Sequence, residues 1–137
     1  MCKFKSAIAV EDGKSKGGFR LLANQWTESH TDLIALFKLR DDGKLRFARV
    51  EFYPDDEKDM ATPAKYRLHI DEERTPEWFD EAKQGACAEQ MRGWIKAMII
   101  QGEVEILCGG AYILANGAKV GTVRNSLIHV MWGSSQV

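Results

Sequence analysis

The chain has 137 residues, with 45% hydrophobic residues, 28% charged residues and a formal net charge of -1. This composition fits one globular domain, and the balanced charge excludes a strong overall attraction to nucleic acid or to an anionic membrane. The cysteines Cys2, Cys87 and Cys108 are odd in number and lack CxxC spacing, so neither a disulfide framework nor a zinc knuckle is indicated. No apolar stretch is long enough to span a bilayer.

The first third of the chain predicts a β-hairpin followed by a helix. Residues 4–10 and 19–23 are apolar enough to form two strands, and the glycine-containing loop between them, 14–18, predicts a hairpin connection. A helix is expected to begin after Thr27 or Ser29, because a side-chain oxygen there accepts the free N–H groups of the first turn. Its apolar residues continue on one broad face as far as residue 39.

The middle of the chain predicts two more strands and a longer helix. Residues 45–53 alternate between apolar and polar side chains, and a slip in this alternation at Ala48-Arg49 predicts a bulge. An acidic loop, 54–63, separates them from a second alternating segment, 65–70. A helix is expected over residues 76–99, because Thr75 suits its cap and Pro76 its first position. Glycines at 85 and 93 weaken it, and a break near Gly85 is an alternative.

The tail is built of short β-rich units. Residues 117–120, 125–128 and 134–137 each combine small or turn residues with a β-branched residue at the end. The apolar marks Val120, Ile128 and Val137 therefore recur at short intervals. This pattern predicts a β repeat that stacks as a solenoid or winds chains around one another.

A unit of this size is not expected to bury its apolar side alone. The repeat pattern stops at Val137 without capping residues, which indicates either a longer chain or capping by another subunit. We therefore expect a homo-oligomer. The predicted fold class is α+β, with an antiparallel sheet, two helices and a C-terminal short-strand β repeat. Residues 1–108 are expected to form the core domain, and 109–137 an oligomerising tail continuous with it.

The residues that look catalytic do not make a complete catalytic site. Ser29, His30 and Asp32 follow one another at a helix start, where they point apart, so capping is the better interpretation than a triad. The acidic residues of the loop 54–63 lack the spacing of a calcium loop. His69 lies at a strand end near the carboxylates of Asp71, Glu72 and Glu73, which is either an exposed strand end or an acid–base candidate. A nuclease or hydrolase that uses His69 and these carboxylates is an alternative. We expect no catalytic residue, no metal site and no cofactor.

Arginines and aromatic rings remain as the groups able to bind a small nucleotide. Guanidinium groups pair with phosphate and aromatic rings stack on bases. The candidate donors are Arg46, Arg49, Arg67, Arg92, Lys119 and Arg124, and the candidate planar surfaces are Trp78, Phe79, Tyr112 and Trp132. Asn116 and Arg124 lie in the tail, where a polar side chain must face solvent, a partner or a ligand. The predicted ligand-binding residues are Arg67, Phe79, Asn116, Arg124 and Trp132.

Several short motifs carry a resemblance to a group of phage and prophage proteins. These motifs are MCKFKSAI at 1–8, SHTDL at 29–33, FARVEF at 47–52, Asp71-Glu72, and PEWF at 76–79. In that group a core of this kind is often followed by a glycine- and serine-rich β repeat, as in residues 117–137. The group is in turn similar to the phage anti-Thoeris signal sponges.

This resemblance implies a protein without catalysis that works in the host cytoplasm. The sponges sequester cyclic ADP-ribose-type signals, and in some members cyclic oligonucleotides, in pockets formed between subunits. The first hypothesis is therefore a phage anti-defence protein whose partners are a small nucleotide signal molecule and further copies of itself, with neither a membrane nor a long nucleic acid as partner. The alternative is a structural phage protein whose C-terminal β repeat multimerises.

Overall fold

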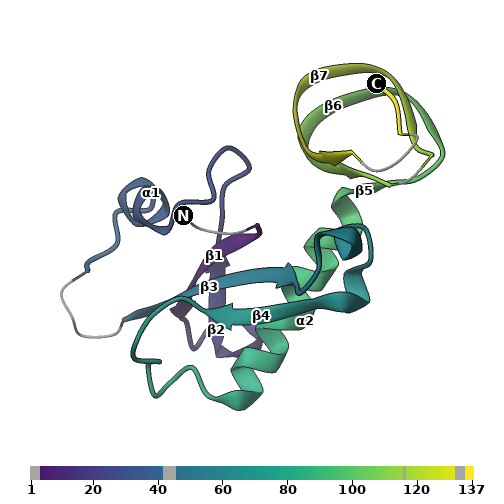
Figure 1. The fold of residues 1–137 in the computed structure, drawn as a ribbon. Helices are drawn as coiled ribbons and strands as arrows, with labels where there is room; N and C mark the ends of the chain where they lie inside the picture. The colour runs from purple at the N-terminus through teal and green to yellow at the C-terminus, as the bar shows by residue number, and fades with distance from the viewer. Residues whose placement is uncertain (1–3, 42–45, 116, 132–134) are drawn as a thin grey trace.

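The described part of the chain has an α+β fold with an antiparallel sheet, two α-helices and a curled parallel sheet. A computed structural model describes residues 4–41, 46–115, 117–131 and 135–137. Figure 1 shows the antiparallel sheet and the long helix α2 forming the body, while the parallel sheet forms a nearly closed ring at one end of it. We call this ring, residues 99–131, the β coil. Within the described residues no helix is long and apolar enough to cross a membrane.

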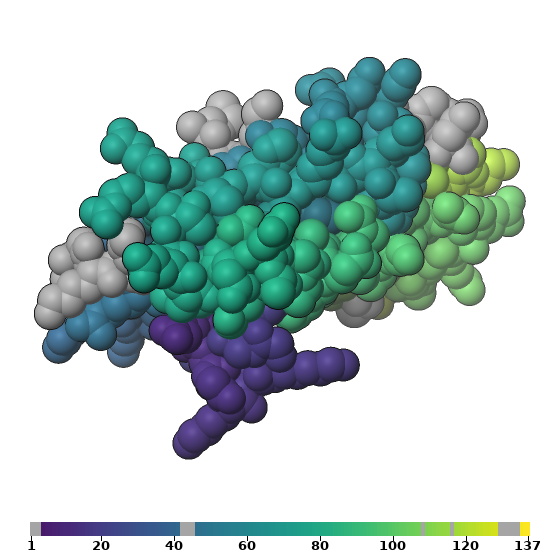
Figure 2. Space-filling view, turned by 90° about the horizontal axis from the view of Figure 1, so that it is seen from below, coloured from purple at the N-terminus to yellow at the C-terminus, as the bar shows by residue number. Residues whose placement is uncertain are grey.

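The antiparallel sheet has the strand order β2-β1-β3-β4. Its strands are β1 (Ser6–Glu11), β2 (Phe19–Leu22), β3 (Phe47–Pro54) and β4 (Tyr66–Ile70), and all four confirm strands expected from the sequence. The hairpin of β1 and β2 stands out from the body in the space-filling view of Figure 2. Three short 3-10 turns connect the elements: η1 (Lys16–Gly18), η2 (Glu57–Asp59) and η3 (Pro63–Lys65).

Both faces of this sheet are covered, which explains the alternation of β3. Val50 and Phe52 face α2 (Glu81–Met98) in the main core, whereas Phe47 packs with Ile8 and Leu33 beneath α1 (His30–Leu36). The predicted bulge at Ala48-Arg49 is wrong, because β1 and β3 pair in unbroken register there. An apolar residue on either face needs no slip when both faces are buried.

The two helices begin with capping side chains. Ser29 is the N-cap of α1, as expected, and its hydroxyl oxygen accepts the Asp32 backbone N–H at 3.3 Å. The predicted start of the second helix is wrong: α2 begins at Glu81, and Asp80 caps it by accepting the Lys83 N–H at 3.0 Å. The preceding residues form a turn, in which the Phe79 N–H donates to the Pro76 carbonyl oxygen at 3.0 Å, and the Phe79 ring is buried in the core. The helix is unbroken at Gly85.

The β coil is a parallel sheet in the order β5-β6-β7, formed by β5 (Ile99–Ile100), β6 (Glu103–Leu114) and β7 (Lys119–Met131). Val120 lies beside Val104, and Ile128 beside Tyr112. One turn of the coil therefore holds two of the short sequence units, and an isolated bridge from Lys119 to Gln136 adds to the stack. The expected repeat is present, but as two long curved strands in place of separate short ones.

The coil buries apolar side chains within one chain. Leu107, Leu114, Ala118 and Val120 form its core, and Ile113 joins the core of the body. These tail residues are therefore buried without another subunit, whereas Val137, also one of the expected apolar positions, is 60% exposed. The homo-oligomer stays a prediction. The parallel sheet also starts at Ile99, before the boundary predicted at residue 109.

Candidate functional site

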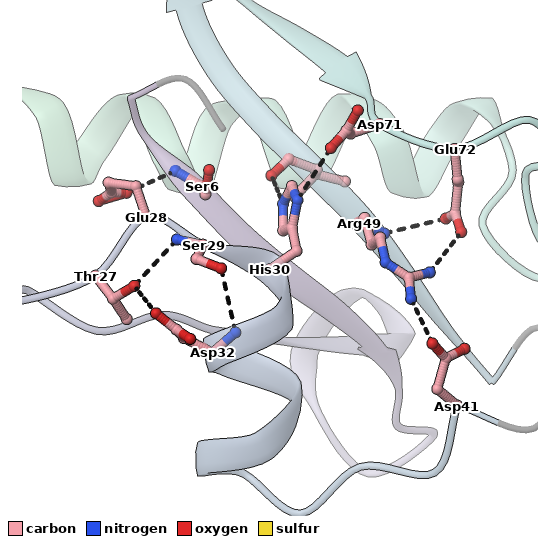
Figure 3. Close-up of polar contacts among 11 residues, drawn as sticks. Ser6, Thr27, Glu28, Ser29, His30, Asp32, Asp41, Arg49, Asp71 and Glu72 are labelled. Carbon is pink, nitrogen blue, oxygen red and sulfur yellow. Dashed lines mark hydrogen bonds and ion pairs between the residues drawn. The ribbon is translucent and has the colours of Figure 1, made fainter. Parts of the chain in front are cut away.

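A buried polar cluster lies where α1 begins above the antiparallel sheet. His30, the first residue of α1, points into the sheet (Figure 3) and is almost completely buried. Its Nε2 lies 2.9 Å from the Val50 carbonyl oxygen, and its Nδ1 lies 3.2 Å from Asp71 Oδ2. Since a carbonyl oxygen only accepts, Nε2 carries the proton of that bond. Nδ1 is thereby the atom directed at the carboxylate.

Glu51 completes a group of three potential metal ligands. Ligand atoms of His30, Glu51 and Asp71 all lie within 4.8 Å of one another. Glu51, on β3, is only 7% exposed, whereas the Asp71 side chain, just after β4, is 53% exposed. The cluster therefore has a buried side and a side open to solvent.

The neighbouring charges are arranged in pairs. The Arg49 guanidinium contacts Glu72 Oε2 at 3.4 Å and Asp41 Oδ2 at 2.7 Å, and the Glu72 carboxylate also accepts the Arg49 backbone N–H at 3.0 Å (Figure 3). Burial raises the pKa of Glu72, opposed by these bonds from Arg49. The positive charge of Arg49 is thus balanced by the carboxylates of Glu72 and Asp41, beside the His30 cluster.

A second buried pair joins the chain start to the segment before α1. Lys5 Nζ lies 2.7 Å from Glu28 Oε1 and donates to the Asn24 carbonyl oxygen at 3.1 Å. The other Glu28 oxygen accepts the Ser6 backbone N–H at 2.9 Å. Burial raises the pKa of Glu28, and the Lys5 charge opposes that rise.

His69, the acid–base candidate of the sequence, is placed differently from what that role requires. Its ring stacks on Tyr53 with centroids 3.9 Å apart, and its Nε2 is buried without a hydrogen-bond partner among the residues described. The carboxylate of Asp71 is joined to His30 instead. His30 and Asp71 are 41 residues apart in the sequence, and the packing of α1 on the sheet brings them together.

A groove runs between the body and the β coil. It has a cavity volume of about 500 Å³, within the range of small-molecule sites. Residues from three places line it: Lys5 with the segment after β2, the last turns of α2, and the bend of β6. Trp94, Met98 and Tyr112 supply its largest apolar surfaces, and Asn24, Gln25 and Lys5 supply polar groups.

The Tyr112 ring is held in place at this groove. Its hydroxyl donates to the Gly109 carbonyl oxygen at 2.6 Å. Gly110 has a positive φ of 100°, and a Cβ there would lie 3.3 Å from the Tyr112 hydroxyl oxygen. The two glycines thus bend β6 so that the ring folds back over the strand, and a ring fixed in this way loses little freedom on binding.

The structure does not gather the predicted ligand-binding residues into one site. Phe79 is 1% exposed and packs in the core against Phe19 and Trp78, so its ring offers no surface to a ligand. Arg67 is 72% exposed on β4 and lies 3.5 Å from Asp55. Arg124 is exposed on β7. Neither lines the groove, and Asn116 and Trp132 lie outside the described residues.

The candidates chosen from the sequence included Tyr112 only as one aromatic surface among several, and they included neither Trp94 nor Lys5. The signal that could have singled out Tyr112 is Gly109-Gly110 just before it, because paired glycines allow a backbone bend that turns a nearby ring inward. Comparison with family models, with curated proteins and with solved structures finds no match for this chain.

Proposed function

We propose that this is a non-enzymatic binding protein that holds a small molecule with a planar, nucleobase-like ring in the groove between α2 and the β coil. The observation that carries the proposal is that two aromatic residues, Trp94 and Tyr112, line one groove of about 500 Å³. Rings of this kind stack on any nucleobase, because every base has a π-face.

The polar groups of the groove favour the base end of a nucleotide over its phosphate. Asn24 and Gln25 line the groove and bring amide groups suited to the edge of a base, although the Asn24 side-chain oxygen already accepts the Trp26 N–H at 2.8 Å. Lys5 is the cation that lines the groove, and its charge is already paired with Glu28. The proposed site therefore binds the base through aromatic rings and amide groups, in place of the arginines that the sequence had suggested for phosphate. Any phosphate of the ligand is directed toward solvent.

Binding alone is sufficient for the sequestering role that the phage-protein resemblance implies. A ligand held at one site per chain is removed from its receptor by mass action, without any reaction. The cyclic nucleotide signals named for the resembling group contain such bases, so they remain the first ligands to test.

The test is calorimetry with cyclic ADP-ribose, cyclic oligonucleotides and adenosine, using the wild type, Tyr112→Ala and Tyr112→Phe. We expect saturable binding to at least one of them, weakened about tenfold or more in Tyr112→Ala, since one base–aromatic stack contributes about 1–3 kcal/mol. Tyr112→Phe keeps the ring and should bind more tightly than Tyr112→Ala. Phe37→Ala, an exposed aromatic residue on the far side of the sheet, is the matched control. No heat with any ligand would count against the proposal.

A second candidate function is assembly through the β coil. β7 is the edge strand of the parallel sheet, and the neighbouring Ile106 is an exposed large apolar side chain, 48% accessible. An edge strand offers backbone groups to which a second copy can pair. Light scattering over a range of concentrations tests this: a mass that rises with concentration and falls back in Thr122→Lys, but not in the control Thr31→Lys, supports assembly along β7. A monomer at all concentrations excludes it.

A further inference from the structure

The cluster of His30, Glu51 and Asp71 has the chemistry of a metal site. An imidazole and two carboxylates converge from α1, β3 and the end of β4, with their ligand atoms within 4.8 Å of one another. Two atoms that each lie about 2.1 Å from a shared ion are about 3.0–3.4 Å apart at octahedral or tetrahedral angles. The 3.2 Å between His30 Nδ1 and Asp71 Oδ2 falls in that interval.

The hydrogen bond on the far side of the imidazole selects the ligand atom. His30 donates its Nε2–H to the Val50 carbonyl oxygen at 2.9 Å. Metal-binding histidines commonly make this second contact, which orients the ring and fixes which nitrogen coordinates the ion. Here that nitrogen is Nδ1, which lies 3.2 Å from Asp71 Oδ2. Two electron-rich atoms at this distance require a positive group between them, either a proton or a metal ion.

We infer that His30 Nδ1, Glu51 and Asp71 bind one divalent transition-metal ion at the junction of α1 with the antiparallel sheet. One imidazole and two carboxylates suit Mn²⁺ or Zn²⁺, because imidazole favours zinc and carboxylate oxygens favour manganese. The exposed side of Asp71 leaves the remaining coordination positions open to water. The site is separate from the α2–coil groove, whose lining residues include none of the three ligands.

The neighbourhood is compatible with a bound cation. Arg49, the nearby guanidinium, is engaged by Glu72 and Asp41. Glu28, two residues before His30, is engaged by Lys5 and the Ser6 N–H. The role of the ion is to tie the start of α1 to the end of β4, two segments that are far apart along the chain.

The test is a titration of the chelator-treated full chain with Mn²⁺, followed by electron paramagnetic resonance of the free ion. Manganese is the better probe because the three thiols of the chain prefer zinc. We expect one ion per chain, bound at least tenfold more weakly in Asp71→Asn and in His30→Gln. The glutamine can still donate to the Val50 carbonyl oxygen. Asp55→Asn, in the exposed acidic loop, is the matched control and should bind as the wild type does.

Paramagnetic broadening locates the ion independently of any variant. With substoichiometric Mn²⁺, the amide signals of Glu51 and Asp71 should broaden before those of residues 55–59. Asp71 is on the exposed side of the cluster, so Asp71→Asn is expected to fold even if His30→Gln does not, and its fold is checked by circular dichroism. The inference is overturned by equal binding in Asp71→Asn, by broadening centred on the acidic loop, or by the absence of saturable binding.

Discussion

Lys5 and Glu28 form a buried ion pair, with Nζ and Oε1 2.7 Å apart and side-chain exposures of 3% and 19%. The pair fixes the chain ahead of β1 to the segment between β2 and α1, and Lys5 also forms part of the groove wall. Glu28 has a second partner in the Ser6 N–H. Loss of the Glu28 side chain therefore removes the carboxylate that binds both the buried Lys5 ammonium and the Ser6 N–H.

Glu28→Ala should destabilise the protein by about 3–5 kcal/mol, because an unpaired buried charge is much more costly than the intact pair is favourable. Urea unfolding followed by circular dichroism measures this. Replacing both partners, as in the double variant Lys5→Met and Glu28→Leu, should recover much of the loss. A single variant as stable as the wild type would show that Lys5 reaches solvent when Glu28 is removed.

Two glycines should respond to alanine in opposite directions. A Cβ at Gly121 would lie 2.6 Å from the Glu105 carbonyl oxygen of the neighbouring strand, so Gly121→Ala should push β6 and β7 apart and cost about 1–3 kcal/mol. A Cβ at Gly85, on the exposed side of α2, meets nothing within 4 Å. Gly85→Ala should therefore stabilise the protein by about 0.5–1 kcal/mol.

Thermal unfolding of the two glycine variants side by side is the measurement. We expect the midpoint temperature of unfolding to be lower than that of the wild type for Gly121→Ala and higher for Gly85→Ala. The packing of β6 on β7 is contradicted if Gly121→Ala unfolds at the wild-type temperature.

Cys87 should be unreactive in the native protein. It lies fully buried on α2 beside Met91, and burial raises the pKa of its thiol to about 12. At pH 8 only about one thiol in ten thousand is then ionised, and the thiolate is the reactive form. Alkylation with iodoacetamide, followed by peptide mass mapping, should label Cys87 only after unfolding. Rapid labelling of the native chain would mean that α2 opens locally.

The same thiol predicts an alkaline loss of stability. A pKa that is higher in the folded state than in the unfolded state contributes stability that is present below about pH 9 and is lost as the pH rises toward 12. Burial also raises the pKa of Tyr66, which adds to this loss. Unfolding free energies measured from pH 8 to 11 should therefore fall, and they should fall less steeply in Cys87→Ala.

Local signals in the sequence predicted the body of the fold well. The alternation of residues 65–70 and the cap at Ser29 act over a few neighbouring residues, and both elements form where they were expected. The bulge at Ala48-Arg49 was wrong because it depends on which face of the sheet another element covers, and alternation alone does not contain that information. The start of α2 was wrong because the chain offers two capping residues, Thr75 and Asp80, and Asp80 is the one that caps the helix.

The sites were harder to predict because they combine distant segments. His30 and Asp71 are 41 residues apart, and Lys5 meets Trp94 and Tyr112 only where the coil closes against the body. Phe79 and Arg67 were chosen as ligand-binding residues by residue type alone. Residue type does not tell whether an aromatic ring lies in the core or on the surface, or whether an arginine lies on an edge strand or in a groove. The β repeat was visible in the spacing of Val120 and Ile128, whereas the curvature that creates the groove depends on backbone bends near Gly109 and Asn125.

Native mass spectrometry of the protein purified from cells with active nucleotide signalling tests the central claim most directly. We predict that the wild type retains a small molecule containing a nucleobase and that Tyr112→Ala, purified in parallel, does not. A ligand-free wild type that also fails to bind the nucleotide panel, or a ligand retained equally by Tyr112→Ala, would contradict the groove as the binding site.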